Sequence, residues 1–97
     1  MKTRNKSYID YGISKQKAND LKRKCQVLNV EERDILLECC KCANQGIAYE
    51  MLYSLIYGVS YDKLIAFVYI PALREDFYAY RRKALSLFNE HLSEGTK

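Results

Sequence analysis

Apolar residues recur at helical spacing over most of the chain. In the first such stretch, Ala18, Leu21, Cys25 and Leu28 follow one another at intervals of three or four residues, which places them on one face of an α-helix. Ser14 stands just before this stretch, where its hydroxyl can accept a hydrogen bond from an amide of the first turn. We therefore predict a first helix that begins after Ser14. Its outer face is basic and carries Lys15, Lys17, Lys22, Arg23 and Lys24.

Two more helices are predicted in the middle of the chain. Asn29, followed three residues later by Glu32, resembles a capping box, in which two reciprocal hydrogen bonds begin a helix. A third helix is predicted over residues 47–57, and Gly58 is suited to end it because glycine readily adopts the left-handed conformation found there. The apolar positions are Leu36, Leu37, Cys40 and Ala43 in the second helix, and Ala48, Met51, Leu52, Leu55 and Ile56 in the third.

Three tyrosines, Tyr49, Tyr53 and Tyr57, run beside the apolar stripe of the third helix at a spacing of four. A helix that is apolar over this much of its girth is either central to a core or shared with a partner. A tyrosine stripe more often forms the edge of a core, but tyrosine is also enriched at interfaces. We predict a homodimer formed through these three tyrosines.

Residues 60–92 indicate a short helix, a tight break and a long helix. Ser60 is a suitable cap for the short helix, predicted over residues 61–68, and Pro71 prevents it from continuing because proline lacks the backbone N–H. The long helix is predicted over residues 74–92. The inward positions are Leu64, Ile65 and Val68 in the short helix, and Phe77, Tyr80, Ala84, Leu87 and Phe88 in the long one.

The predicted fold is all-α: one domain of 97 residues, built as a small bundle of four or five helices with a C-terminal helix-turn-helix over residues 60–92. Residues 1–13 precede the first helix and are predicted to be a flexible basic arm. Lys2, Arg4 and Lys6 can lie on a phosphate backbone, although a frayed and solvated terminus is the simpler interpretation.

Composition excludes several classes of protein. No apolar run reaches the roughly 20 residues of a membrane span: the longest, residues 64–72, is interrupted by Pro71. The basic start of the chain has no apolar stretch behind it, so we expect no signal peptide and a cytoplasmic protein with reduced thiols. The net charge of +4 permits nucleic-acid binding without requiring it.

The candidate catalytic and metal-binding residues are few. Cys39, Cys40 and Cys42, with Cys25 and His91 elsewhere, are the only residues that suggest zinc. They fall inside predicted helices, whereas zinc knuckles sit in turns, so we interpret them as small core residues and expect no metal, no disulfide and no cofactor. Neither a nucleophile with a matching base nor a glycine-rich phosphate loop occurs. We therefore expect neither an enzyme nor a protein with a small-molecule substrate.

The long C-terminal helix is the main candidate for DNA recognition. In a DNA-binding helix-turn-helix, the second helix lies in the major groove while the first crosses the backbone. Basic and tyrosine side chains are predicted opposite the core face of this helix, and arginine donates well to phosphates and to guanine edges. Arg81 is our candidate for a base contact and Arg82 for a phosphate contact. The expected contacts to double-stranded DNA are Arg74, Tyr78, Arg81, Arg82, Lys83 and, from the preceding helix, Lys63.

The same segment carries a recognisable series of residues. It reads Ser-Tyr-x-x-Leu, then Tyr-Ile-Pro, then Asp-Phe-Tyr-x-Tyr-Arg-Arg-Lys-Ala-Leu, within residues 60–85. This resembles the C-terminal helix-turn-helix of phage-type late-gene and packaging-region transcription regulators of the ArpU and RinA kind, which is related in shape to region four of sigma factors. The resemblance implies a sequence-specific DNA-binding regulator of transcription from a phage or another mobile element. It assigns the recognition helix to Phe77, Tyr78, Arg81, Arg82, Lys83, Ala84 and Leu85.

Two departures from this pattern leave an alternative open. Leu73 stands where the family usually has serine or threonine, and Glu75 and Asp76 place negative charge on the first turn of the helix. These acids either complement the helix dipole or indicate that the helix faces a protein. The alternative function is a small protein-binding adaptor or inhibitor, for example a mobile-element protein that blocks a host nucleic-acid-binding protein.

Overall fold

A computed structural model of the chain describes the backbone of residues 7–95 and the side chains of residues 7–93. The described residues contain five α-helices and two short 3₁₀ helices, and they contain no strand, so the predicted all-α fold is confirmed. The elements are η2 (Ile9–Tyr11), α1 (Lys15–Cys25), α2 (Val30–Ala43), η3 (Gln45–Ile47), α3 (Ala48–Tyr57), α4 (Tyr61–Leu64) and α5 (Arg74–Gly95).

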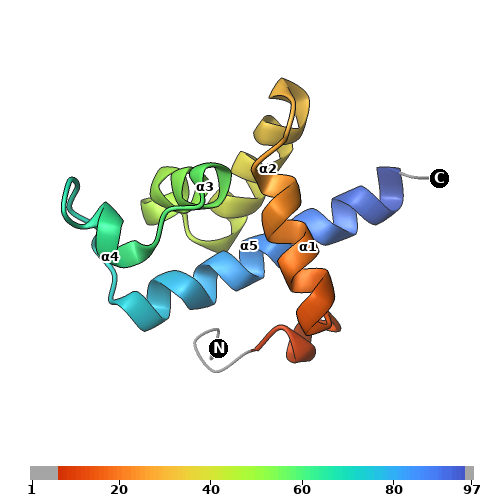
Figure 1. Cartoon of the computed structure of the whole chain (residues 1–97), viewed down its shortest axis with the longest axis horizontal. Helices are drawn as coiled ribbons and strands as arrows, with labels where there is room; N and C mark the ends of the chain where they lie inside the picture. Colours follow the sequence, from red (N-terminus) through yellow and green to blue (C-terminus); the bar gives the residue numbers. More distant parts are fainter. Residues whose placement is uncertain (1–6, 96–97) are drawn as a thin grey trace.

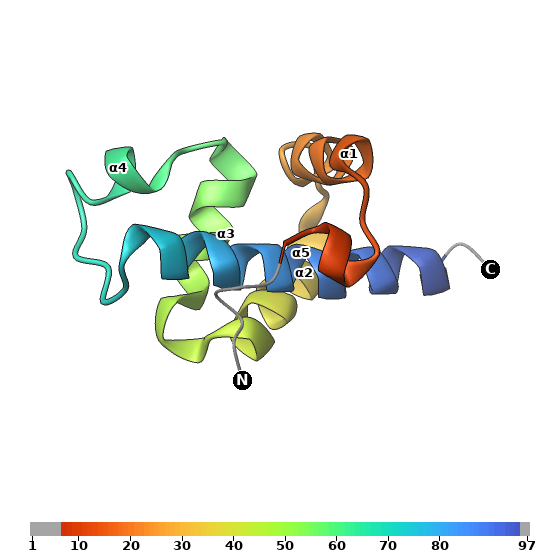
Figure 2. The same cartoon turned by 90° about the horizontal axis from the view of Figure 1, so that it is seen from below.

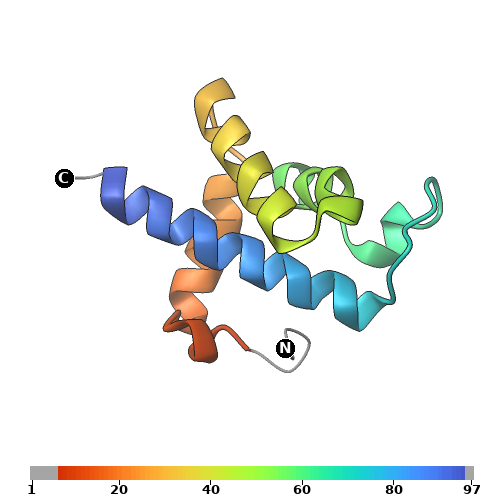
Figure 3. The same ribbon diagram turned by 180° about the vertical axis from the view of Figure 1, so that it is seen from behind.

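The longest helix, α5, forms the axis around which the others are arranged (Figure 1). α2 packs along α5 and α3 packs against α2; Figure 3 shows these helices from behind. α1 crosses the C-terminal half of α5, while α4 lies near its N-terminal end. Figure 2 shows α1 and α4 on the same side of α5, separated along its length.

The helix boundaries follow local capping signals. The Ser14 hydroxyl accepts a hydrogen bond from the Lys17 amide at 3.1 Å and begins α1. Asn29 and Glu32 form the predicted capping box at the start of α2, with distances of 2.8 and 3.1 Å. α3 ends at Gly58, whose φ of 64° lies in the left-handed region. The predicted beginnings of α1 and α2 and the predicted end of α3 are therefore confirmed.

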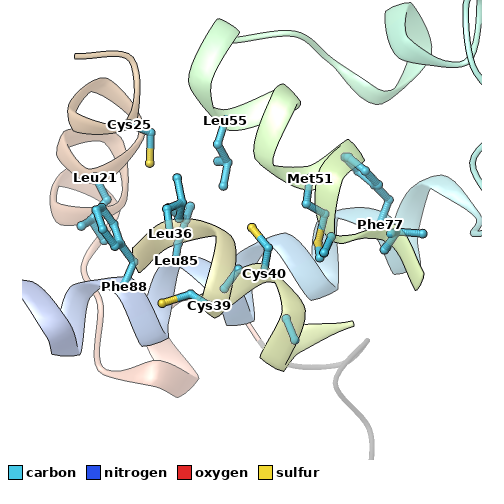
Figure 4. Packing of buried hydrophobic residues seen from close by; sticks show 14 of the residues in the cluster. Leu21, Cys25, Leu36, Cys39, Cys40, Met51, Leu55, Phe77, Leu85 and Phe88 are labelled. Atoms are coloured by element: carbon cyan, nitrogen blue, oxygen red, sulfur yellow. The ribbon is translucent and has the colours of Figure 1, made fainter. Parts of the chain in front are cut away.

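The hydrophobic core forms where α1, α2, α3 and α5 meet (Figure 4). Phe77 and Phe88 of α5 are fully buried, as predicted for the core face of that helix. Leu85, which the family resemblance assigns to the recognition helix, is also fully buried, and Ala79 is 1% exposed. α5 is thus covered over a wider part of its circumference than the predicted core face. The core side chains labelled in Figure 4 are Leu21, Cys25, Leu36, Cys39, Cys40, Met51, Leu55, Phe77, Leu85 and Phe88.

The short helix α4 is shorter than predicted. Ser60 caps it as expected, by accepting from the Lys63 amide at 3.2 Å, but the helix ends at Leu64 and residues 65–73 connect it to α5. Ile65 and Val68, predicted to point inward, are 48% and 45% exposed. That prediction is wrong because the chain turns away from the core after Leu64 and returns only at Ile70, which is 5% exposed.

The segment before α1 also differs from the prediction. Residues 1–6, which include Lys2, Arg4 and Lys6, lie outside the described residues. Within residues 7–13, Ile13 is 2% exposed and Tyr8 packs against the core. These side chains place residues 7–13 against the bundle, at positions where a flexible basic arm was predicted. Among the described helices, none combines the length and the apolar character that crossing a membrane would need.

Candidate functional site

A polar pocket of about 310 Å³ lies between α1, α3 and α5. α1 contributes Lys22, the C-terminal end of α3 contributes Ser54, and α5 contributes Tyr78 and Arg81. None of the lining residues is an aspartate or a glutamate. The complete lining is Lys22, Gln26, Ser54, Leu55, Gly58, Val59, Ser60, Tyr78 and Arg81. We call this cavity the α1–α5 pocket.

Arg81 is the most constrained charged residue of the pocket. Its Nη1 donates to the Ser54 hydroxyl at 2.9 Å, and its guanidinium carbon lies 4.7 Å from the centre of the Tyr78 ring. Burial lowers the pKa of Arg81 from its ordinary value. Its Nε is buried and has no hydrogen-bond partner among the described protein atoms. Leaving a buried donor unpaired costs about 1–3 kcal/mol, and an acceptor that reached this atom would offset that cost.

The end of α3 forms the part of the pocket wall that Arg81 contacts through Ser54. Ser54, which is fully buried, donates to the backbone oxygen of Val59 at 2.6 Å. Gly58 provides the reversal between them, and a Cβ at this position would lie 3.3 Å from Nε2 of Gln26. The close approach and the positive φ both favour glycine here. The reversal brings Ser60, the cap of α4, to the rim of the pocket.

Tyr78 has a hydrogen-bonding role that leaves its hydroxyl proton available. The backbone amide of Tyr61 donates to the Tyr78 hydroxyl oxygen at 2.9 Å. A tyrosine hydroxyl both accepts and donates, so Tyr78 can still donate its proton to an acceptor in the pocket while it holds α4 against α5.

Positive charge converges beside the pocket. Burial lowers the pKa of Lys22, and the nearby charges of Arg81 and Arg82 lower it further. Tyr8 lies in the same group: Nζ of Lys22 is 5.5 Å from the centre of its ring. Burial raises the pKa of Tyr8, and Arg81 and Arg82 oppose that rise. We refer to Lys22, Arg81 and Arg82 as the basic cluster. No carboxylate of the described residues lies within ion-pair distance of Lys22 or Arg81.

The predicted DNA contacts therefore fall into two groups. Tyr78 and Arg81 face the α1–α5 pocket, and Arg82 and Lys83 beside them are partly buried. Arg74 and Lys63 are exposed at the other end, where Arg74 lies 3.5 Å from Asp62. Arg74 and Arg81 are seven residues apart, or about 10 Å along the helix axis. One helix connects the two groups, but they do not form one contiguous site.

Sequence reasoning missed the contribution of α3 to this site. Lys22 was assigned only to the outer basic face of the first helix, and Gln26 and Ser54 had no assigned role. One signal was present: Ser54 is the polar residue inside the apolar run Met51–Ile56, at a position that the helical spacing places near the core.

An apolar groove of about 370 Å³ lies on another part of the surface. Tyr49 and Tyr53 of α3 form one wall, and Phe67 and Val68 form another. Phe67 and Tyr69 are each 85% exposed, which is unusual for side chains of this size. A concentration of exposed apolar residues is typical of a surface that binds another protein.

Three of the four cysteines belong to the core. Cys25, Cys39 and Cys40 are buried, and Cys42 is exposed. In the described part of the chain, no group of three or more histidine, cysteine or acidic side chains is arranged to hold a metal ion. The three buried thiols pack as small residues of the core.

Comparison with protein-family models, with curated proteins and with solved structures finds no match for this chain.

Proposed function

We propose that the protein binds double-stranded DNA as a regulator of transcription and contacts phosphates through the basic cluster. The observation that carries this proposal is that Lys22 of α1 and Arg81 of α5 line one pocket, with Arg82 next to Arg81 in α5. Like charges repel, so their concentration on one side of a small protein favours a polyanionic partner.

The distribution of charge along the chain supports the same conclusion. α1 has one acidic residue, Asp20, and residues 77–89 of α5 have none. Much of the negative charge instead lies on α2, which carries Glu31, Glu32, Asp34 and Glu38. The basic residues on these two segments are Lys15, Lys17, Lys22, Arg23, Lys24, Arg81, Arg82 and Lys83.

The geometry favours phosphate contacts over base reading by Arg81. A recognition helix must expose one full side to the major groove, but α5 is covered on several sides and Arg81 is bonded to Ser54. The connection of residues 65–73 between α4 and α5 is also longer than the three- or four-residue turn of the motif. We therefore assign base reading, and with it the proposed sequence specificity, to the exposed residues Arg74 at the start of α5 and Lys63 of α4.

A mobility shift tests this proposal. Wild-type protein is mixed with a duplex from the DNA that flanks its own gene, and random duplex is added as competitor. We expect a shifted complex that survives an excess of random DNA. Binding that random DNA removes completely would contradict sequence-specific regulation and leave only general DNA binding.

The apolar groove and the exposed apolar side chains beside it favour a second candidate, a protein-binding adaptor or inhibitor. Phe67, Tyr69 and Leu73 are 85%, 85% and 64% exposed, and large aromatic side chains are common anchors of protein interfaces. The two candidates use different surfaces and can be separated by substitution. Phe67→Ala should leave DNA affinity unchanged if DNA is the partner, whereas it should weaken capture of a partner protein.

A further inference from the structure

We infer that the α1–α5 pocket binds a phosphate group. This goes beyond the proposed contact with DNA, because the site is a recessed cavity that a single phosphate can enter. The group can come from a nucleic-acid backbone or from a soluble phosphate ester, and both present the same oxygens to the pocket.

The pocket offers hydrogen-bond donors from α1 and α5, from Gln26 just after α1 and from the loop after α3. Arg81 lines the pocket, and its Nε has no partner in the described protein; Lys22 provides an ammonium group. The Tyr78 hydroxyl accepts from Tyr61 and so can direct its own proton elsewhere. Gln26 and Ser60 add polar groups at the edge. Phosphate, with several strongly accepting oxygens, suits such a set of donors.

The absence of acidic side chains from the lining makes the site selective for anions. A carboxylate among the lining residues would neutralise Lys22 or Arg81 and repel phosphate, but none is present. The cavity of about 310 Å³ lies at the lower end of the roughly 300–1,000 Å³ found for small-ligand sites. It therefore fits a phosphate or a small phosphate ester.

The basic cluster gives a second reason to expect an anion. Lys22, Arg81 and Arg82 are close enough for each arginine to depress the pKa of Lys22. A bound phosphate would reverse this effect, because an opposite charge at short range stabilises the protonated amine. Substitution of Lys22 by glutamine removes one of the repelling charges, so the variant should fold.

A phosphate titration followed by amide NMR tests the inference at constant ionic strength, with sodium chloride replaced stepwise by sodium phosphate. We expect saturable shifts concentrated at Gly58, Ser60 and Arg81. Lys22→Gln should weaken phosphate binding about tenfold or more, as for the loss of one charge-assisted hydrogen bond. Lys17→Gln is the matched control, because it removes the same charge from an exposed position of α1 outside the pocket, and it should bind phosphate as the wild type does.

Two results of this titration would overturn the inference. Shifts spread evenly over exposed lysines, or equal effects of Lys22→Gln and Lys17→Gln, would show that phosphate acts only through the general charge of the protein. Thermal melting in chloride alone checks that both variants are folded before the titration is interpreted.

Competition with duplex DNA identifies the source of the phosphate. If phosphate displaces DNA more strongly than chloride of equal ionic strength, the pocket accepts a backbone phosphate. If phosphate saturates the pocket without weakening DNA binding, its ligand is a soluble ester. A protein that binds phosphate but no DNA would contradict the proposed function and support this inference. A protein that binds DNA while its pocket takes up no phosphate would support the proposed function and contradict this inference.

Discussion

Burial controls the chemistry of the cysteines at the scale of single residues. It raises the pKa of Cys25 and of Cys40 to about 12, and that of Cys39 to about 11. The thiolate is the reactive form, and these three thiols remain protonated at pH values well below those pKa values. Cys42 lies on the same helix as Cys39 and Cys40 but is exposed.

Thiol modification should therefore distinguish the exposed Cys42 from the three buried cysteines by its rate. At pH 8 in the folded protein, we expect a disulfide reagent to modify Cys42 quickly and the buried cysteines slowly. After denaturation, all four cysteines should react at similar rates. Absorbance of the released thiol measures both cases, and rapid reaction of more than one thiol in the folded protein would contradict the burial described here.

Ser54 is a second residue whose role depends on its surroundings. It is fully buried, donates to the Val59 oxygen and accepts from Arg81. Ser54→Ala would leave both of these groups without that partner, so the free energy of unfolding should fall by about 1–3 kcal/mol. Urea denaturation measures the change. Ser86→Ala serves as the control because Ser86 is also buried in a helix but makes no side-chain hydrogen bond within residues 7–93. An equal loss in both variants would contradict the role of Ser54.

At the scale of helices and loops, capping residues correctly predicted where helices begin. Features that depend on contacts between residues far apart in the chain could not be predicted. Ser14, Asn29 and Ser60 each begin a helix as predicted, because a cap acts on amides only two or three residues away. The direction of Arg81 could not be predicted, because its partner Ser54 is 27 residues earlier in the chain. The end of α4 also depends on tertiary packing, since the core takes up Leu64 and Ile70 but not the residues between them.

The packing of α5 gives a prediction with a close control. Phe88 is fully buried, so Phe88→Ala should lower the free energy of unfolding by about 3–5 kcal/mol. Phe67 is 85% exposed, so Phe67→Ala should change it by no more than about 0.5 kcal/mol. Chemical denaturation of the two variants measures the difference. Similar losses in both would mean that residues 65–69 are buried in the protein in solution.

At the scale of the whole molecule, two surfaces of different character stand out. The basic cluster lies beside the α1–α5 pocket, and the apolar groove lies along Tyr49, Tyr53 and Phe67. Tyr57 is 60% exposed, and its ring lies 4.6 Å from that of Tyr53. The tyrosines predicted to form a dimer are thus exposed in the single chain, and separate surfaces would allow a dimer to bind DNA.

Sedimentation tests the predicted dimer. The wild type at tens of micromolar should sediment as a dimer through Tyr49, Tyr53 and Tyr57, and Tyr53→Glu should sediment as a monomer because a charge would be buried in the interface. Tyr69→Glu is the control, since Tyr69 is exposed but does not line the groove. A wild-type protein that remains monomeric at this concentration would contradict the predicted dimer.

The salt dependence of DNA binding tests the central claim most directly. The logarithm of the binding constant falls linearly with the logarithm of the salt concentration, with a slope of about −0.9 for each phosphate contact. Replacing Lys22 and Arg82 by glutamine should therefore make the slope shallower by about two, whereas replacing Arg33 and Lys41 of α2 should leave it unchanged. Equal slopes for the two double variants would contradict phosphate binding by the basic cluster. So would a dissociation constant no tighter than about 10⁻⁴ M for any duplex at physiological salt, because that is weaker than ordinary non-specific binding.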